Sequence, residues 1–76
     1  MDKASIQTKV GIRIKTLREE KKISQQELAS LCDFEKSNMS RLEAGNTNPT
    51  LYTLFKICIA LDISLPELFE GFEIKS

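Results

Sequence analysis

The segment from Ser24 to Gly45 constrains the fold of this chain more than any other part of the sequence, and it reads S-Q-Q-E-L-A-S-L-C-D-F-E-K-S-N-M-S-R-L-E-A-G. Ser24 followed three residues later by Glu27 is a capping box, which predicts that a helix starts there. Apolar residues at helical spacing continue on one side of it, and after a short interruption the same spacing resumes at Met39 and Leu42. The segment therefore predicts two short helices that share one apolar seam.

The interruption Asp33-Phe34-Glu35 is too short for a wandering loop. Two helices joined by a turn of three or four residues form a helix-turn-helix, in which the second helix can lie in the major groove of DNA. This arrangement makes DNA binding the hypothesis that the remainder of the sequence must support or oppose.

The length of 76 residues predicts one small domain over 1–76, with flexible ends at 1–5 and 73–76, because a chain this short cannot support two cores. The sequence contains no apolar run of 18 residues, and its N-terminus lacks the apolar region of a signal peptide. We therefore expect a cytoplasmic protein that makes no contact with a membrane.

The two cysteines, Cys32 and Cys58, lie far apart on apolar stripes, which predicts buried reduced thiols rather than a zinc site or a disulfide framework. The chain contains no histidine and no glycine motif of a nucleotide-binding site. No nucleophile and base occur together in a catalytic pattern. We therefore expect no enzyme activity, no metal, no cofactor and no small-molecule ligand.

The formal net charge of zero argues against DNA binding, since phosphate contacts normally require a basic domain. The distribution of charge weakens this objection, because only two of the basic residues, Lys56 and Lys75, follow residue 49. The acidic excess is thus C-terminal, where a partner subunit could lie.

A first helix is predicted from about residue 6 to residue 22, with a core stripe formed by Ile6, Val10, Ile14 and Leu17. Arg18 projects about 80° from Val10 and so falls on the edge of that stripe. On the third helix Glu43 falls beside the inward-facing Met39, where a carboxylate requires a cation. We predict an ion pair between Arg18 and Glu43 that locks the first helix to the third.

The third helix, predicted from about residue 35 to residue 44, places a polar set of side chains opposite its apolar face. These side chains are either a hydrated surface or a set of groups that read base edges, with Arg41 suited to guanine O6 and N7. The predicted base-reading residues are Lys36, Ser37, Asn38, Ser40 and Arg41.

Phosphate contacts are predicted on both sides of the third helix. Gln25 and Gln26 lie in the first turn of the second helix, where they are either hydrated side chains or donors to the DNA backbone. Gly45 is predicted as a left-handed helix cap, and the polar loop after it contributes Asn46 and Asn48 as further phosphate ligands.

The helix predicted from residue 51 to residue 61 is apolar nearly all round, so we expect it to be the central buried helix. Ser64 with Glu67 forms a second capping box, which starts a short fifth helix over about residues 65–70. This terminal segment carries more large apolar side chains than the edge of one small core can bury. We therefore predict a homodimer interface formed by Leu65, Phe69, Phe72 and Ile74.

Four fragments together resemble the Cro/C1-type, or lambda-repressor-like, helix-turn-helix family: I-S-Q-Q-E-L-A, S-N-M-S-R-L-E-A-G, N-P-T-L-Y-T-L and A-L-D-I-S-L-P-E-L-F. The resemblance spans about Val10 to Phe69. It implies an all-α, five-helix DNA-binding domain with the helix-turn-helix at about 24–45, usually dimeric, with the third helix in the major groove. It also implies phosphate contact by Gln25, base contacts by Lys36, Ser37, Ser40 and Arg41, and the Arg18–Glu43 ion pair.

Two positions depart from the pattern of that family. Asp33 stands in the turn where the family often has glycine, and Glu35 stands where serine or threonine often starts the third helix. DNA phosphates repel a nearby glutamate unless it accepts a hydrogen bond from a cytosine amino group. The helix-turn-helix of this chain is thus less basic than is usual in that family. We therefore expect the specificity for DNA sequence to depend heavily on Lys36 and Arg41.

Our first hypothesis is a sequence-specific transcriptional regulator that binds double-stranded DNA as a homodimer, on a palindromic operator with half-sites about 34 Å apart. A chain this short resembles phage repressors, Cro-like proteins and the small controller proteins of restriction-modification systems. The regulator could activate transcription, repress it or do both. The alternative is an antitoxin or another protein-interaction module with the same fold. Loss of operator binding with function retained in a Lys36→Ala, Arg41→Ala double mutant would favour the alternative.

Overall fold

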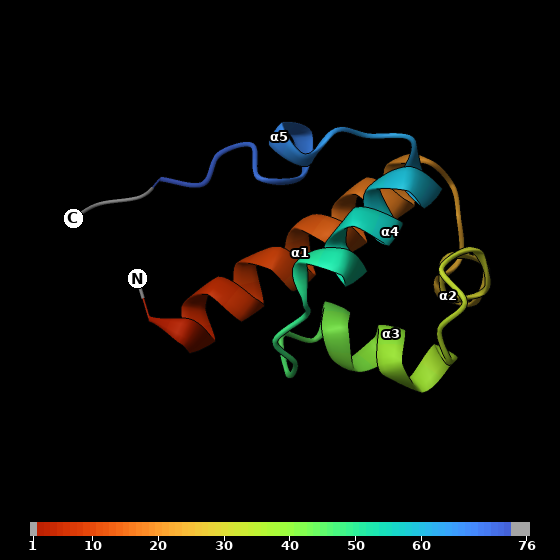
Figure 1. The fold of residues 1–76 in the computed structure, drawn as a ribbon, viewed down its shortest axis with the longest axis horizontal. Helices are drawn as coiled ribbons and strands as arrows, with labels where there is room; N and C mark the ends of the chain where they lie inside the picture. The colour runs from red at the N-terminus through yellow and green to blue at the C-terminus, as the bar shows by residue number, and fades with distance from the viewer. Residues whose placement is uncertain (1, 74–76) are drawn as a thin grey trace.

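The structure is a computed structural model that describes residues 2–73, and over this range the chain forms five helices and no strand. The longest helix, α1, runs across the molecule, with α4 beside it, α3 and α2 towards one side and α5 on the other (Figure 1). The predicted all-α, five-helix fold is confirmed. The helices are α1 (Lys3–Glu20), α2 (Gln25–Leu31), α3 (Lys36–Glu43), α4 (Leu51–Leu61) and α5 (Leu65–Leu68).

Short polar side chains start four of the five helices. Ser24 and Ser64 each accept a hydrogen bond from the third helical amide, and the carboxylates of Glu27 and Glu67 each accept one from the backbone amide of the cap, so both predicted capping boxes are present. Asp2 caps α1 through a bond from the Ser5 amide of 2.8 Å. Because of this cap, α1 begins at Lys3 rather than at the predicted residue 6.

Side chains from all five helices meet in one core, in which those that are fully buried include Ile14, Leu28, Met39, Ile57, Leu61, Leu68 and Cys32. Ile6, which was predicted to belong to this core, is 44% exposed. That prediction was wrong: the first turns of α1 extend past the end of α4 (Figure 1), and Ile6 is left at the surface.

The helix α4 is amphipathic rather than buried all round. Its buried side chains are Leu54, Ile57, Cys58 and Leu61, whereas the large apolar side chains Leu51, Tyr52, Phe55 and Ile59 are exposed. The prediction of a central buried helix was wrong because residues 2–73 pack against one side of α4 only. No helix in this described range is long and apolar enough to span a membrane.

Two glycines allow α1 to approach α3 closely. A Cβ on Gly11 would lie 2.5 Å from the carbonyl oxygen of Glu43, which is closer than real Cβ atoms come to backbone. Gly45, in the left-handed conformation predicted for the cap (φ +81°), packs similarly against Thr8, whose Cα would lie 2.8 Å from an added Cβ. These contacts hold α3 against α1 and leave its opposite face at the surface.

Candidate nucleic-acid interface

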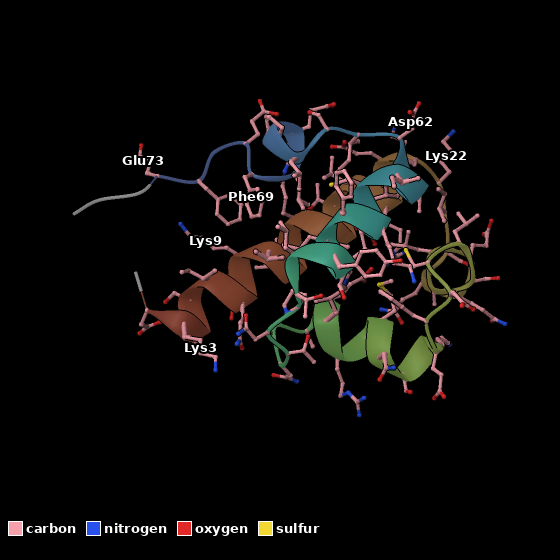
Figure 2. The ribbon with its side chains drawn as sticks, viewed as in Figure 1. Lys3, Lys9, Lys22, Asp62, Phe69 and Glu73 are labelled. Atoms are coloured by element: carbon pink, nitrogen blue, oxygen red, sulfur yellow. The ribbon has the colours of Figure 1, made fainter. Side chains whose placement is uncertain are left out.

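The helix α3 divides into a buried face and an exposed polar face. Met39, Leu42 and Glu43 are buried. The predicted base-reading residues are all exposed together on the other side, and they are Lys36, Ser37, Asn38, Ser40 and Arg41. The side chains of α3 lie along one edge of the molecule, and Lys3, at the start of α1, points to the same side of the view (Figure 2).

Arg41 is linked to Asn38, one turn earlier on the same helix, through a hydrogen bond that its Nη2 donates to Oδ1 of Asn38. This bond occupies the acceptor of Asn38, while the amide donors of Asn38 and the remaining N–H groups of Arg41 are left available. Asn38 therefore orients the longest cationic side chain on the exposed face of α3.

The predicted ion pair between Arg18 and Glu43 is present. Nε of Arg18 donates to Oε2 of Glu43 at 2.7 Å, and Nη2 donates to Oε1 at 3.0 Å. A third guanidinium nitrogen donates to the carbonyl of Ile23 at 2.9 Å. Hydrogen bonding to the Glu43 carboxylate raises the pKa of Arg18 above its ordinary value, against the opposing effect of burial. The start of α2 is thus tied to the contact between α1 and α3.

Gln25 belongs to this same network. Its Nε2 donates to Oε1 of Glu43 at 3.0 Å, and the residue is half-buried. The sequence predicted Gln25 as either a hydrated side chain or a phosphate donor and did not reveal this contact, because the contact depends on how closely α2 approaches α3. The amide has a second hydrogen, so the contact leaves one donor for another acceptor. The neighbouring Gln26 is exposed.

The loop between α3 and α4 carries the other two predicted phosphate ligands. Asn46 and Asn48 are both exposed, and Asn48 lines the same surface hollow as Asn38, beside Phe34 and Pro49. The structure therefore brings part of this loop next to the first turn of α3.

The turn before α3 contains the two acidic residues that depart from the pattern of the family, Asp33 and Glu35. Asp33 adopts a left-handed backbone conformation (φ 58°), which explains why glycine suits this position. Glu35 is the N-cap of α3, but its side chain makes no capping hydrogen bond, and it is exposed beside Lys36.

The predicted dimer residues Leu65, Phe69 and Phe72 are partly buried against the core of their own chain, and Ile74 lies outside the described residues. The Phe69 ring points towards α1 (Figure 2) and meets Phe72 edge-on at 5.3 Å between centroids. Arg13 of α1 holds this segment by donating to the carbonyls of Glu67 at 2.7 Å and Leu68 at 3.3 Å.

Sequence reasoning missed a second apolar surface, which we call the outer face of α4 and define by Leu51, Tyr52, Phe55 and Ile59. These side chains are 72%, 71%, 52% and 70% exposed. The ammonium group of Lys56 lies 5.5 Å from the centroid of Tyr52 and 5.1 Å from that of Phe34. The spacing of four between Leu51, Phe55 and Ile59 was the available signal, but the apolar residues on the other side of the helix concealed it.

No group of three or more potential ligands for a metal ion occurs within residues 2–73. The thiols of Cys32 and Cys58 are unpaired and buried, as predicted, and burial raises the pKa of both. A raised pKa disfavours the reactive thiolate, so both cysteines behave as core residues.

Comparison with known proteins identifies the family. A family model described as helix-turn-helix matches residues 14–68. The HTH-type transcriptional regulator y4dJ of Sinorhizobium fredii is 39% identical over 59 residues, which cover 78% of this chain and 77% of the relative. Control protein C.MunI from Mycoplasma sp is 38% identical over 69 residues, or 90% of this chain and 93% of that protein.

Among solved structures, the restriction-modification controller protein C.AhdI from Aeromonas hydrophila superposes with a TM-score of 0.82 at 37% identity. The match covers 86% of this chain and 98% of C.AhdI, so the two folds correspond over nearly their whole length. The helices α2 and α3 are the two halves of the helix-turn-helix, and the chain belongs to the helix-turn-helix family of transcriptional regulators.

Proposed function

We propose that this protein regulates transcription by binding a palindromic operator in double-stranded DNA as a homodimer, with α3 in the major groove. The observation that supports this most strongly is the division of α3 into two faces. One face is locked to the core through Met39, Leu42 and Glu43, and the other is entirely polar and exposed. A rigid helix that presents short donors around one long cation has the form of a recognition helix.

Within this proposal, Arg41 donates two parallel hydrogen bonds to O6 and N7 of a guanine, and Lys36 contacts a second base at the N-terminal end of α3. Ser37 and Ser40 are short enough to allow α3 to approach the base edges closely. Asn38 contributes partly through Arg41, whose guanidinium it already holds.

Phosphate contacts would come from Gln25 and Gln26 on one side of α3 and from Asn46 and Asn48 on the other. These donors are neutral, and the chain has no net charge, so hydrogen bonding would carry more of the backbone affinity than in a strongly basic domain. The buried network that includes Glu43 would fix Gln25 relative to α3 and so couple phosphate contact to base contact.

The relatives suggest a biological setting. Control protein C.MunI and the restriction-modification controller C.AhdI match this chain over most of its length. We therefore propose that this chain is a restriction-modification controller protein of the same kind. Activation and repression are both compatible with this role, because the outcome depends on where the operator lies relative to a promoter.

Selection of bound sites from a random pool of double-stranded DNA tests the proposal. The wild-type protein should enrich a palindrome with half-sites about one helical turn apart. The Lys36→Ala, Arg41→Ala double mutant should enrich none. A matched control is Lys9→Ala with Lys22→Asn, which removes two positive charges from positions away from α3 (Figure 2) and should leave the palindrome unchanged.

Salt dependence provides an independent measure. The affinity for the selected palindrome should fall steeply as salt is added, because each phosphate contact releases condensed counterions. A regulator that retained its function in cells after the double mutation abolished DNA binding would instead be a protein-interaction module. Equal enrichment by the double mutant and the wild type would refute the assignment of α3 as the recognition helix.

A further inference from the structure

Asn38 and Arg41 lie three residues apart on α3, so their side chains are neighbours on the exposed face of this helix. Nη2 of Arg41 donates a hydrogen bond to Oδ1 of Asn38. The ion pairs within residues 2–73 are formed by Arg13 and Arg18, so in this range no carboxylate neutralises Arg41. The group that holds this guanidinium is therefore a neutral amide, and its positive charge is kept for another partner.

The bond fixes which end of the Asn38 amide faces outward. A side-chain amide has an acceptor oxygen and a donor nitrogen, and a half-turn of its last torsion exchanges their places. Arginine carries only N–H donors and no acceptor, so the oxygen of Asn38 must be the end that faces Arg41. The amide nitrogen, with its two hydrogens, therefore lies on the side away from the guanidinium.

The same bond leaves Arg41 able to contact a base. A guanidinium has two edges that each present a parallel pair of N–H groups, one formed by Nη1 and Nη2 and the other by Nη2 and Nε. Nη2 has one hydrogen on each edge, so its bond to Asn38 uses one edge and leaves the other complete. That remaining edge matches O6 and N7 of guanine. Holding the guanidinium in advance also reduces the side-chain freedom that is lost when DNA binds.

We propose that Asn38 and Arg41 act as one unit that offers only donors to DNA and so determines specificity. Arg41 reads a guanine, and Asn38 reads an acceptor on the adjacent base pair, which is O6 or N7 of guanine or O4 of thymine and excludes adenine. This inference rests on the proposed function, which places α3 in the major groove, and it deepens that function by identifying the bases. Asn38 is at once a specificity-determining residue and a positioning residue for Arg41.

The exclusion of adenine follows from the shared oxygen. An unconstrained asparagine pairs well with adenine, because it accepts from N6 and donates to N7 at the same time. The oxygen of Asn38 already accepts from a cation. An adenine amino group that shared this oxygen would bring its own partial positive charge beside the guanidinium, and the two would repel each other. Guanine and thymine avoid the conflict, since their major-groove edges offer acceptors.

NMR spectroscopy of the full chain without DNA tests the pair itself. In Asn38→Ala the guanidinium N–H resonances of Arg41 should shift, and at low temperature their exchange with water should accelerate. Asn38→Asp should retain the slower exchange, because a carboxylate also accepts from the guanidinium. Thr16→Ala is the matched control, since it removes another exposed polar side chain, on α1 beside Arg13. Arg41 resonances that Asn38→Ala leaves unchanged would overturn the inference.

Selection of bound sites from random double-stranded DNA tests the bases. The wild type should enrich a half-site in which the Arg41 guanine lies next to guanine or thymine, and it should bind that site about 10-fold more tightly than the adenine variant. Asn38→Asp should change this adjacent base to cytosine, whose amino group is a donor, and should keep the Arg41 guanine. Asn38→Ala should relax both positions without changing the dependence of affinity on salt, because no charge is removed.

Arg41→Met provides the converse test. It frees the oxygen of Asn38, so the preference at the position that Asn38→Asp alters should change to adenine. Competition between the four single-base variants at low salt measures this, because low salt strengthens the binding of a weakened variant. If Arg41→Met binds no DNA even then, the results for the wild type and Asn38→Asp decide.

Circular dichroism and thermal unfolding should be unchanged in Asn38→Ala, since the side chain is exposed, so a loss of specificity is not a loss of fold. An adenine preference of the wild type at the position altered by Asn38→Asp overturns the inference. So does a preference at that position that Arg41→Met leaves unchanged. A wild-type protein that enriches no palindrome contradicts the proposed function, whereas a palindrome with adenine at that position contradicts only this assignment of bases.

Discussion

The guanidinium of Arg18 on α1 and the carboxylate of Glu43 on α3 form a two-bond ion pair that joins residues 25 positions apart. The two side chains are only 10% and 3% exposed, so water screens their attraction little. In addition, Glu43 accepts from Gln25 and Arg18 donates to the carbonyl of Ile23. One buried network therefore connects α1, the start of α2 and α3.

Replacing Glu43 by alanine leaves the Arg18 charge buried without its partner, so the free energy of unfolding should fall by about 3–5 kcal/mol. Urea denaturation measures the loss. Arg18→Ala should cost a similar amount, and the double mutant should lose less than the sum of the two, because the second change removes a charge already stranded. Strict additivity, or an unchanged melting temperature in Glu43→Ala, would show that the pair contributes nothing.

Gly11→Ala should destabilise the fold even though alanine is the better helix former. In an open helix this change would gain about 1 kcal/mol. Here the added Cβ would lie 2.5 Å from the Glu43 carbonyl oxygen and 2.6 Å from that of Leu42, and both of these are backbone atoms that cannot turn aside. We expect a net loss of about 1–3 kcal/mol from forced separation of α1 and α3.

The exposed Lys15 of α1 provides a comparison for that substitution, since Lys15→Ala changes helix propensity without adding bulk against α3. Thermal unfolding of both variants should show a lowered midpoint for Gly11→Ala and a near-native one for Lys15→Ala. A stabilised Gly11→Ala protein would indicate that α1 and α3 can separate at no cost.

Features set by nearby residues could be predicted from the sequence. Both capping boxes require only a serine and a glutamate three residues apart, and both are present. The pairing of Arg18 with Glu43 followed from helical periodicity, since each residue fell at the edge of an apolar stripe with no other means of neutralisation. The exposed polar face of α3 followed from the same periodicity.

Features set by packing between distant segments could not be predicted in this way. The outer face of α4 has the composition of a core, and its exposure depends on which helices cover it. The C-terminal aromatic residues have the composition of an interface, yet Arg13 and α1 hold them within the chain. The bond from Gln25 to Glu43 likewise depends on how α2 and α3 meet. Periodicity identifies an apolar face but not its partner.

The capping box of α5 should make stability depend on pH through Glu67. Hydrogen bonds from the amide and hydroxyl of Ser64 lower the pKa of Glu67 below its ordinary value. A carboxylate whose pKa is lower in the folded state stabilises the fold when the pH is above its unfolded-state pKa. This stabilisation is lost as the pH falls through its folded-state pKa.

The urea midpoint of Glu67→Gln should therefore decline less than that of the wild type on acidification. Glu20→Gln is the comparison, because this exposed carboxylate at the end of α1 lies outside the box. Identical acid profiles for Glu67→Gln and the wild type would contradict this role.

Glu35→Ser should improve both stability and DNA affinity, because Glu35 occupies the N-cap of α3 without a capping bond. A serine oxygen at this position accepts from an otherwise unpaired helical amide, and we expect a gain of about 0.5–1 kcal/mol in the free energy of unfolding. The change also removes a negative charge beside Lys36, so affinity for the selected palindrome should rise, and most at low salt.

Glu35→Gln separates the two effects, since it removes the charge without supplying a good cap. If Glu35→Ser and Glu35→Gln both left DNA affinity unchanged, the N-terminal end of α3 would lie away from the phosphates.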